Sequence, residues 1–408
     1  MRSELRHSAV LVAGTVVTAG LTLAYQILAG RTLGRIEYAQ FGAAIAFMNL
    51  GCMAVGPING TVTKFVAGYA GRGEVGKIRG LYDVLSRQVG RFGLVILVIG
   101  LIGVKPLASV LQLDSVWPLL AAYAVIGLTL YANVVRGVLR GVQYFGHYSL
   151  NLVLESAWRL GVGALLFLLF HDAGVGVVAY VAALGLALPV ARFHLIPVWR
   201  GHEPEKVDAA AIRRFAVPMF VLAACVAGFE NLDYLFIKHY FTDGESGAYY
   251  AATTLSRGMG VFAAPFNVLL LPLIGSMVEQ SGRIVRTLFR VCAYFLLLVA
   301  APVVVFGLWP KFVIGGLYGD AFTAGAEVLP RLTIARLLGY LGVMICLFFA
   351  SIDRFGFLRV YIPGLAGQVA ALVFWHDSML TVATVIMVVQ AVMVTTLLAL
   401  VARSFHQR

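Results

Sequence analysis

The feature that most constrains this chain is the series of long apolar segments that follow one another along almost its whole length. A helix that crosses the hydrocarbon core of a membrane needs about 20 apolar residues, and more when it is tilted. On that rule the sequence predicts an all-α membrane protein with twelve transmembrane helices. The predicted spans are residues 9–30, 38–66, 92–112, 116–135, 147–170, 174–191, 216–239, 247–278, 288–308, 328–350, 355–375 and 379–402.

Composition supports the same class. The chain has 61% hydrophobic and 12% charged residues, whereas soluble domains carry about 25% charged residues. A net charge of +12 would suit a nucleic acid only if Lys and Arg were gathered on one face with a readable motif. The basic residues are instead distributed from loop to loop, so we expect a lipid bilayer and no nucleic acid as the surroundings.

The orientation of the chain follows from its basic residues. Of the 31 Lys and Arg, 22 fall in one set of alternate loops, five in the other, and four within or at the ends of predicted helices. Basic loops collect on the cytoplasmic side, so a multi-pass protein with both termini in the cytoplasm is predicted. The first apolar run is longer than a signal-peptide core and a second run follows at once, so we expect a retained helix and no cleavable segment.

The longest polar segment between helices, residues 192–214, divides the chain into two predicted six-helix lobes, 1–191 and 215–408. Six is even, so both lobes enter the membrane from the same side. Such parallel repeats are a known transporter arrangement, with the site between the repeats near the midplane. A short internal sequence similarity, called the echo below, supports this repeat. Chance similarity is the alternative. Glu37, Phe41 and Pro57-Ile58-Asn59 reappear 208 residues later as Glu245, Tyr249 and Pro265-Phe266-Asn267.

Both copies of the echo place a proline inside a predicted helix. Pro57 and Pro265 each remove a backbone donor and clash with the preceding turn, so each helix should kink there. Asn59 and Asn267 follow and can satisfy the freed carbonyls or face a polar cavity. The two interpretations, a hinge beside a cavity and a packing kink, both stay open.

Charged residues within the predicted spans are the main site candidates. Glu230 and Asp233 lie three apart on one face of the seventh helix, and Arg257 lies roughly 15 Å from the outer end of the eighth. Charges at such depth are costly unless they are paired or hydrated. One interpretation is a buried ion pair that joins the two helices. In the other, Arg257 offers its planar guanidinium to an anionic head group that enters the cavity, while the acids tune or replace that partner.

Other arginines extend the candidate site. Glu155 and Arg159 have the i, i+4 spacing of a pair within one helix, which is our first interpretation of them. Arg136 and Arg140 end the fourth helix at the cytoplasmic face, where they either anchor the helix or capture a phosphate at the cytoplasmic mouth. Arg336 opens the tenth helix near the outer face and is a further candidate for the cavity.

Enzymatic signatures do not stand out. The chain has no G-x-x-x-x-G-K-[ST] nucleotide loop, and its four cysteines each stand alone in apolar runs. Without paired cysteines or a zinc-type His motif, neither a disulfide framework nor a metal site is suggested. We therefore expect a transporter rather than an enzyme, with no metal and no cofactor.

Three segments resemble polysaccharide flippases of the multidrug/oligosaccharidyl-lipid/polysaccharide (MOP) exporter superfamily. They are Gly34-Arg35-Ile36-Glu37-Tyr38-Ala39-Gln40-Phe41; Arg136-Gly137-x-x-Arg140-Gly141-x-x-x-Phe145; and Asn231-Leu232-Asp233-x-x-x-x-Lys238-His239-Tyr240-Phe241 with Gly247-x-Tyr249-Tyr250-x-Ala252. The resemblance implies two six-helix lobes around a central cationic cavity. It also implies movement of polyprenyl-pyrophosphate-linked sugars, such as O-antigen units, across the bacterial inner membrane by alternating access.

The sequence is therefore compatible with three functions. The first is a flippase for a lipid-linked oligosaccharide, with substrate contacts at Arg257, Arg336 and Arg159. The second is a multidrug or small-molecule antiporter of the same fold, coupled to H⁺ or Na⁺ through Glu230 and Asp233. The third is a non-transporting membrane component that recruits glycan polymerases or glycosyltransferases.

Overall fold

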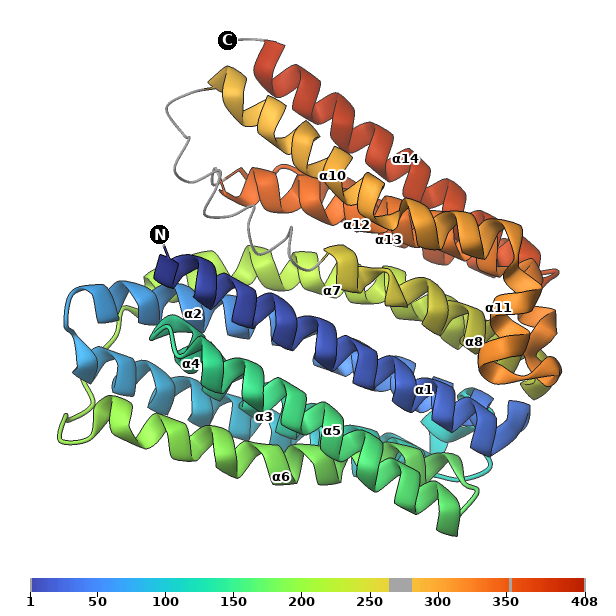
Figure 1. Cartoon of the computed structure of the whole chain (residues 1–408), viewed down its shortest axis with the longest axis horizontal. Helices are drawn as coiled ribbons and strands as arrows, with labels where there is room; N and C mark the ends of the chain where they lie inside the picture. Colours follow the sequence, from blue (N-terminus) through green and yellow to red (C-terminus); the bar gives the residue numbers. More distant parts are fainter. Residues whose placement is uncertain (1, 264–280, 352–353, 407–408) are drawn as a thin grey trace. The chain divides into compact units, whose positions relative to one another are not determined.

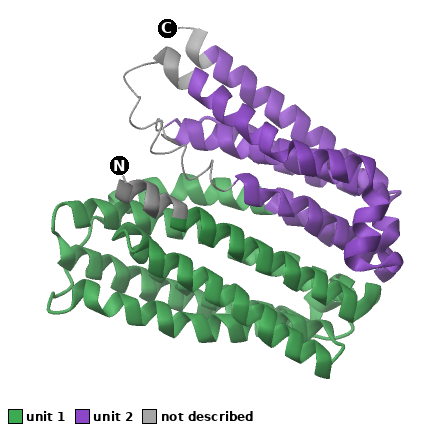
Figure 2. Ribbon diagram, in the orientation of Figure 1, with its two compact units in different colours: residues 1–227 green, residues 228–408 purple. Residues whose placement is uncertain are grey.

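The computed structural model describes residues 2–263, 281–351 and 354–406. Within these residues the chain is almost entirely helical and contains no strand. Two compact units divide it, Met1–Ala227 and Gly228–Arg408 (Figure 2). The division falls inside one long helix, α7, so this helix contributes to both units. The predicted division into 1–191, a linker and 215–408 concerns membrane lobes and stays a prediction.

Unit 1 is a bundle of long helices that run beside one another (Figure 1). Its elements are α1 (Arg2–Gly51), the 3₁₀ turn η1 (Cys52–Ala54), α2 (Val55–Gly71), α3 (Val75–Val110), α4 (Trp117–Gly141), α5 (Phe145–Leu169), α6 (Ala173–Trp199) and the first part of α7 (Ala209–Tyr240). Its apolar core lies where α2, α3, α4, α6 and the start of α7 meet.

Unit 2 contains the rest of α7 and a second group of helices (Figure 1). They are α8 (Asp243–Gly258), α10 (Ser281–Leu308), α11 (Pro310–Tyr318), the 3₁₀ segment η2 (Asp320–Glu327), α12 (Leu329–Ser351), α13 (Leu358–Phe374) and α14 (Met379–His406). The short elements α11 and η2 were not among the predicted spans, because nine and eight residues are too few to register as membrane-crossing segments.

The prediction of long apolar helices that can cross a membrane is confirmed. In the described part of the chain, nine helical stretches are long and apolar enough to cross a membrane, and α13 is a shorter apolar helix. One stretch, Val10–Gly71, covers two predicted spans, which meet at a break in α1 where Gly34 has φ 72°. The eighth span begins as α8 and continues outside the described residues, so the number twelve stays a prediction.

The break predicted near Pro57 is present. The α-helix gives way to the 3₁₀ turn Cys52–Ala54 just before α2, and Pro57 is the third residue of α2. Proline removes a backbone donor and crowds the preceding turn, so the interruption lies where its ring acts. The equivalent residues Pro265 and Asn267 lie outside the described residues.

The polar segment between α6 and α7 packs against α3. The backbone N–H of Glu205 donates to the Gly76 carbonyl at 2.9 Å, and a Cβ placed on Gly80 would lie 1.9 Å from the Glu205 carbonyl oxygen. Only glycine allows the segment to approach this closely. Beyond it, Lys64 lies 3.8 Å from the ring centroid of Phe215, which ties the start of α7 to α2.

Glu37 and Glu245 occupy equivalent positions of the echo. Each of them caps the start of a helix. Glu37 accepts a hydrogen bond from the N–H of Ala173 at the start of α6 at 2.9 Å. Glu245 forms a capping box with Thr242 at the start of α8. Exposed N–H groups at helix starts need such acceptors, so both glutamates have a structural use.

Candidate functional site

The carboxylate of Asp233 on α7 is the centre of a charged cluster in unit 2. Its side chain is 0% exposed, and Oδ2 lies 2.8 Å from Nη2 of Arg336 on α12. Oδ1 lies 3.9 Å from Nη2 of Arg257 on α8, and the hydroxyl of Tyr249 donates to Oδ2 at 3.3 Å. Two guanidinium groups and a phenol therefore surround one acid.

The same two arginines also bind the backbone of α7. Arg336 donates to the carbonyl oxygens of Phe229 at 3.0 Å and Glu230 at 3.1 Å, and Arg257 donates to the Glu230 carbonyl. Tyr340 on α12 in turn donates to the carbonyl of Arg257 at 3.0 Å. The cluster thus joins three helices through both side chains and carbonyls.

The three charges singled out on the seventh and eighth helices have different environments. Asp233 and Arg257 do come together, and Arg336 is the closer partner of the acid. The side chain of Glu230 is only partly buried, and it forms no ion pair with any residue that the structure describes. Sequence spacing could not link Arg336 to α7, because 103 residues separate it from Asp233.

Arg136 forms a largely buried ion pair in unit 1. Its Nε donates to Asn151 Oδ1 at 2.8 Å, and its Nη2 pairs with Glu155. Asn151 then donates to the Ala187 carbonyl on α6 at 2.6 Å. The predicted pairing of Glu155 with Arg159 is therefore replaced by a pairing with Arg136, because the guanidinium of the neighbouring helix α4 reaches the acid directly.

The direct side-chain partners of Arg159 are uncharged groups. Its Nη2 donates to Thr22 Oγ1 at 2.8 Å and to Ser156 Oγ at 3.2 Å. Its guanidinium carbon lies 4.5 Å from the ring centroid of Tyr180, a cation–π contact. Thr22 is 208 residues before Glu230, the same offset as in the echo, and the Glu230 carbonyl accepts from the buried Arg336.

Arg140, one turn after Arg136 on α4, contacts α2. Its Nη1 lies 3.5 Å from Asn59 Oδ1, and Asn59 donates to Asn133 Oδ1 at 3.3 Å. Gly137 packs against α2, where an added Cβ would lie 2.6 Å from the Cβ of Val62. The glycines of the Arg136-Gly137-x-x-Arg140-Gly141 motif thus let α2 approach, while its two arginines serve different neighbours.

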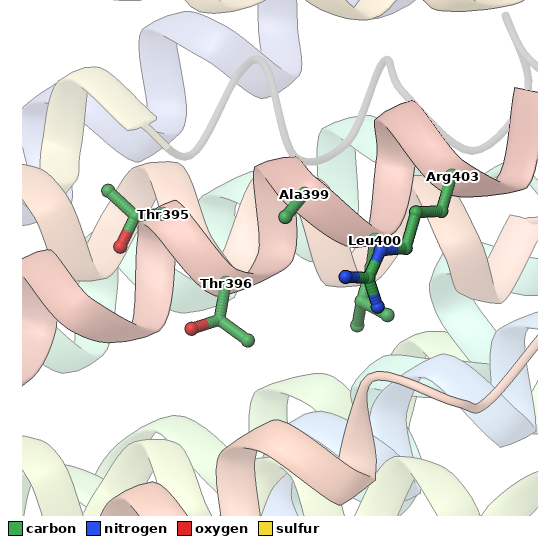
Figure 3. A pocket seen from close by; sticks show the side chains of 5 residues that line it. All are labelled: Thr395, Thr396, Ala399, Leu400 and Arg403. Atoms are coloured by element: carbon green, nitrogen blue, oxygen red, sulfur yellow. The ribbon is translucent and has the colours of Figure 1, made fainter. Parts of the chain in front are cut away.

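The described part of the chain shows no metal-binding cluster. Among the described residues no group of three or more His, Cys, Asp or Glu side chains could hold a metal ion. An open pocket lies near the end of α14, lined by Thr395, Thr396, Ala399, Leu400 and Arg403 (Figure 3). None of the residues predicted from the sequence lines it.

Solved structures of other membrane transporters have a similar architecture. The fold is similar to that of an inward-facing multidrug-resistance MATE family transporter of the MOP superfamily, with a TM-score of 0.75 and 14% identity over 97% of this chain and 98% of the other. It is also similar to the lipid II flippase MurJ, with a TM-score of 0.73 and 14% identity over 96% and 87% of the two chains. A MOP superfamily transporter from Pyrococcus furiosus, described as having a binding pocket of reverse polarity, gives 0.70 and 15% over 98% and 95%.

These structural similarities show the fold, which is that of MOP transporters, as the sequence motifs indicated. No curated protein matches the chain in sequence. The family model described as polysaccharide biosynthesis protein, however, matches residues 5–278, which is well over half of the chain. The chain is therefore a membrane protein that belongs to the polysaccharide biosynthesis protein family.

Proposed function

We propose that this protein is a flippase that moves a polyprenyl-pyrophosphate-linked oligosaccharide across the bacterial inner membrane by alternating access. The observation that carries the proposal is the balance of charge within the membrane-spanning helices. On α4 and α5 of unit 1 three arginines, Arg136, Arg140 and Arg159, accompany the single acid Glu155. Fixed positive charge in a membrane is costly in free energy. An anionic substrate is the ligand that would offset this cost.

Arginine also has the right shape for this substrate. Its planar guanidinium presents several N–H donors in a rigid fork that matches phosphate oxygens, whereas lysine offers a point charge. Membership of a polysaccharide biosynthesis family and the fold shared with MurJ support a substrate that combines sugar, phosphate and lipid.

The arginines suit different roles in this scheme. Arg140 is half-buried at the cytoplasmic end of α4 and forms no ion pair with a described residue, so we assign it to phosphate capture at the cytoplasmic mouth. Arg257 is 17% exposed, with a buried Nε that has no partner among the described groups, and we assign it to a second contact. Arg336, Arg159 and Arg136 are almost enclosed and would act mainly through their electrostatic field.

The antiporter alternative requires an acid that exchanges H⁺ or Na⁺. Asp233 is poorly suited, because two guanidinium groups already neutralise it. Glu230 remains as the acid for ion coupling in unit 2. The Pro57–Asn59 break is our proposed hinge for the helix movement, with Pro265 and Asn267 as its counterpart. Recruitment of glycan polymerases or glycosyltransferases is compatible with flipping and does not replace it.

Export of glycan to the cell surface tests the proposal. Arg140→Ala and Arg257→Ala should each lower export about 10- to 100-fold, because each removes a charge-assisted hydrogen bond worth about 1.5–3 kcal/mol. Arg91→Ala, which alters an exposed arginine on α3, is the matched control and should export normally. Normal export by both test variants at equal protein levels would refute the assignment. Loss of cationic drug efflux in Glu230→Gln with normal surface glycan would favour the antiporter.

A further inference from the structure

Arg159 is a cation buried near the middle of a membrane-spanning helix. It lies 14 residues after the start of α5 at Phe145, or roughly 21 Å along the axis. Its side-chain hydrogen bonds go to the hydroxyl oxygens of Thr22 and Ser156. Each of these hydroxyls gives its own hydrogen to a carbonyl of its own helix. They supply lone pairs to the guanidinium but no negative charge.

Arg136 and Arg159 together with Glu155 leave this part of unit 1 with an excess of one positive charge. Glu155 is the only acid in the sequence of α4 and α5, and Arg136 binds it directly. Arg159 therefore shares a counter-charge that is already engaged. An uncompensated charge at this depth costs several kcal/mol, and the cost falls when an opposite charge is placed beside it.

Two buried donors at this position also lack partners. The Nε of Arg159 and the hydroxyl of Thr18 are inaccessible to solvent, and neither has a hydrogen-bond partner in the described part of the chain. Thr18 lies one turn before Thr22 on α1, hence on the same face of that helix. Buried donors are almost always satisfied, so a small group that accepts hydrogen bonds is expected beside Arg159.

We infer that unit 1 holds a resident small monovalent anion of the size of chloride beside Arg159, between α1 and α5. Water could satisfy the donors, but it would leave the positive charge unbalanced. A larger anion is disfavoured because Arg159 is only 7% exposed. The unit 2 cluster differs, since Arg257 and Arg336 face Asp233 and lie beside Glu230, which balances their charge. The inference does not depend on the transported substrate.

Bromide provides the direct test, because it replaces chloride and scatters anomalously. Crystals of the full chain grown in bromide should show an anomalous peak within hydrogen-bond distance of the Arg159 Nε. In detergent, the unfolding temperature should rise by about 2 °C for each tenfold increase in bromide above its dissociation constant, at ionic strength held constant with gluconate. No peak and no rise would mean water only and would overturn the inference.

Variants separate this site from general salt effects. Arg159→Met removes the charge and should abolish the bromide dependence, whereas Arg91→Ala should retain all of it. Arg159→Lys keeps a positive charge and should retain a weakened dependence. An unchanged bromide response in Arg159→Met would refute the site. If Arg159→Met does not fold, the anomalous peak in the unmodified protein still decides the question.

Discussion

Asp233 is a carboxylate with no exposed surface in a helix that crosses the membrane, and its arginine partners explain how α7 tolerates it. Removal of one member of such a buried pair leaves the other charges uncompensated, at a cost of about 3–5 kcal/mol. Asp233→Ala should therefore lower the unfolding temperature in detergent markedly. Asp83→Ala, at a more accessible position near the start of α3, should change it little. Equal stability of the two variants would contradict the role assigned to Asp233.

A second variant separates the loss of the ion pair from the loss of the other contacts that Arg336 makes. Replacement of Asp233 by Leu together with Arg336 by Met exchanges charged groups for apolar groups of similar volume, which is often neutral or stabilising. This double variant should recover a large part of the unfolding temperature lost in Asp233→Ala. Failure of any recovery would show that Arg336 contributes to stability mainly through the α7 carbonyls.

Close contact between α2 and α4 depends on glycine. A Cβ on Gly137 would lie 2.6 Å from Val62 Cβ, whereas a Cβ on Gly146 of α5 would meet nothing within 4 Å. We therefore predict that Gly137→Ala destabilises the protein and lowers its level in the membrane. Gly146→Ala should be neutral or stabilising by up to about 1 kcal/mol, since alanine favours helix. A stabilised Gly137→Ala variant, measured by thermal unfolding, would contradict the packing described.

Sequence patterns predicted the elements better than the contacts between them. Apolar run length located the spanning helices, and Pro57 located the break before α2, because both signals are local. The partner of Glu155 was mispredicted, since the i, i+4 rule sees Arg159 but not Arg136 on the neighbouring helix. Arg336 was recognised as a candidate, yet its place beside Asp233 depends on tertiary packing that a single sequence does not encode locally.

The topology of the whole molecule gives a separate prediction. The distribution of basic residues predicts that the termini and the segment around Glu203 lie in the cytoplasm, and that Lys311 and Asp377 lie outside. In a background without the four native cysteines, Lys311→Cys and Asp377→Cys should react with a membrane-impermeant maleimide in intact spheroplasts. Glu203→Cys should react only after lysis. The reverse pattern would invert the predicted orientation.

The contact between Glu205 and the glycines of α3 has a consequence for attempts to divide the protein. A backbone cut after Gly201 would separate the fragments 1–201 and 202–408 covalently, but not physically. The second fragment would still carry Glu205, which binds the Gly76 carbonyl, and Phe215, which lies against Lys64. Fragments produced from two separate genes should therefore reassemble in the membrane, and a bulky side chain at Gly80 should weaken their copurification.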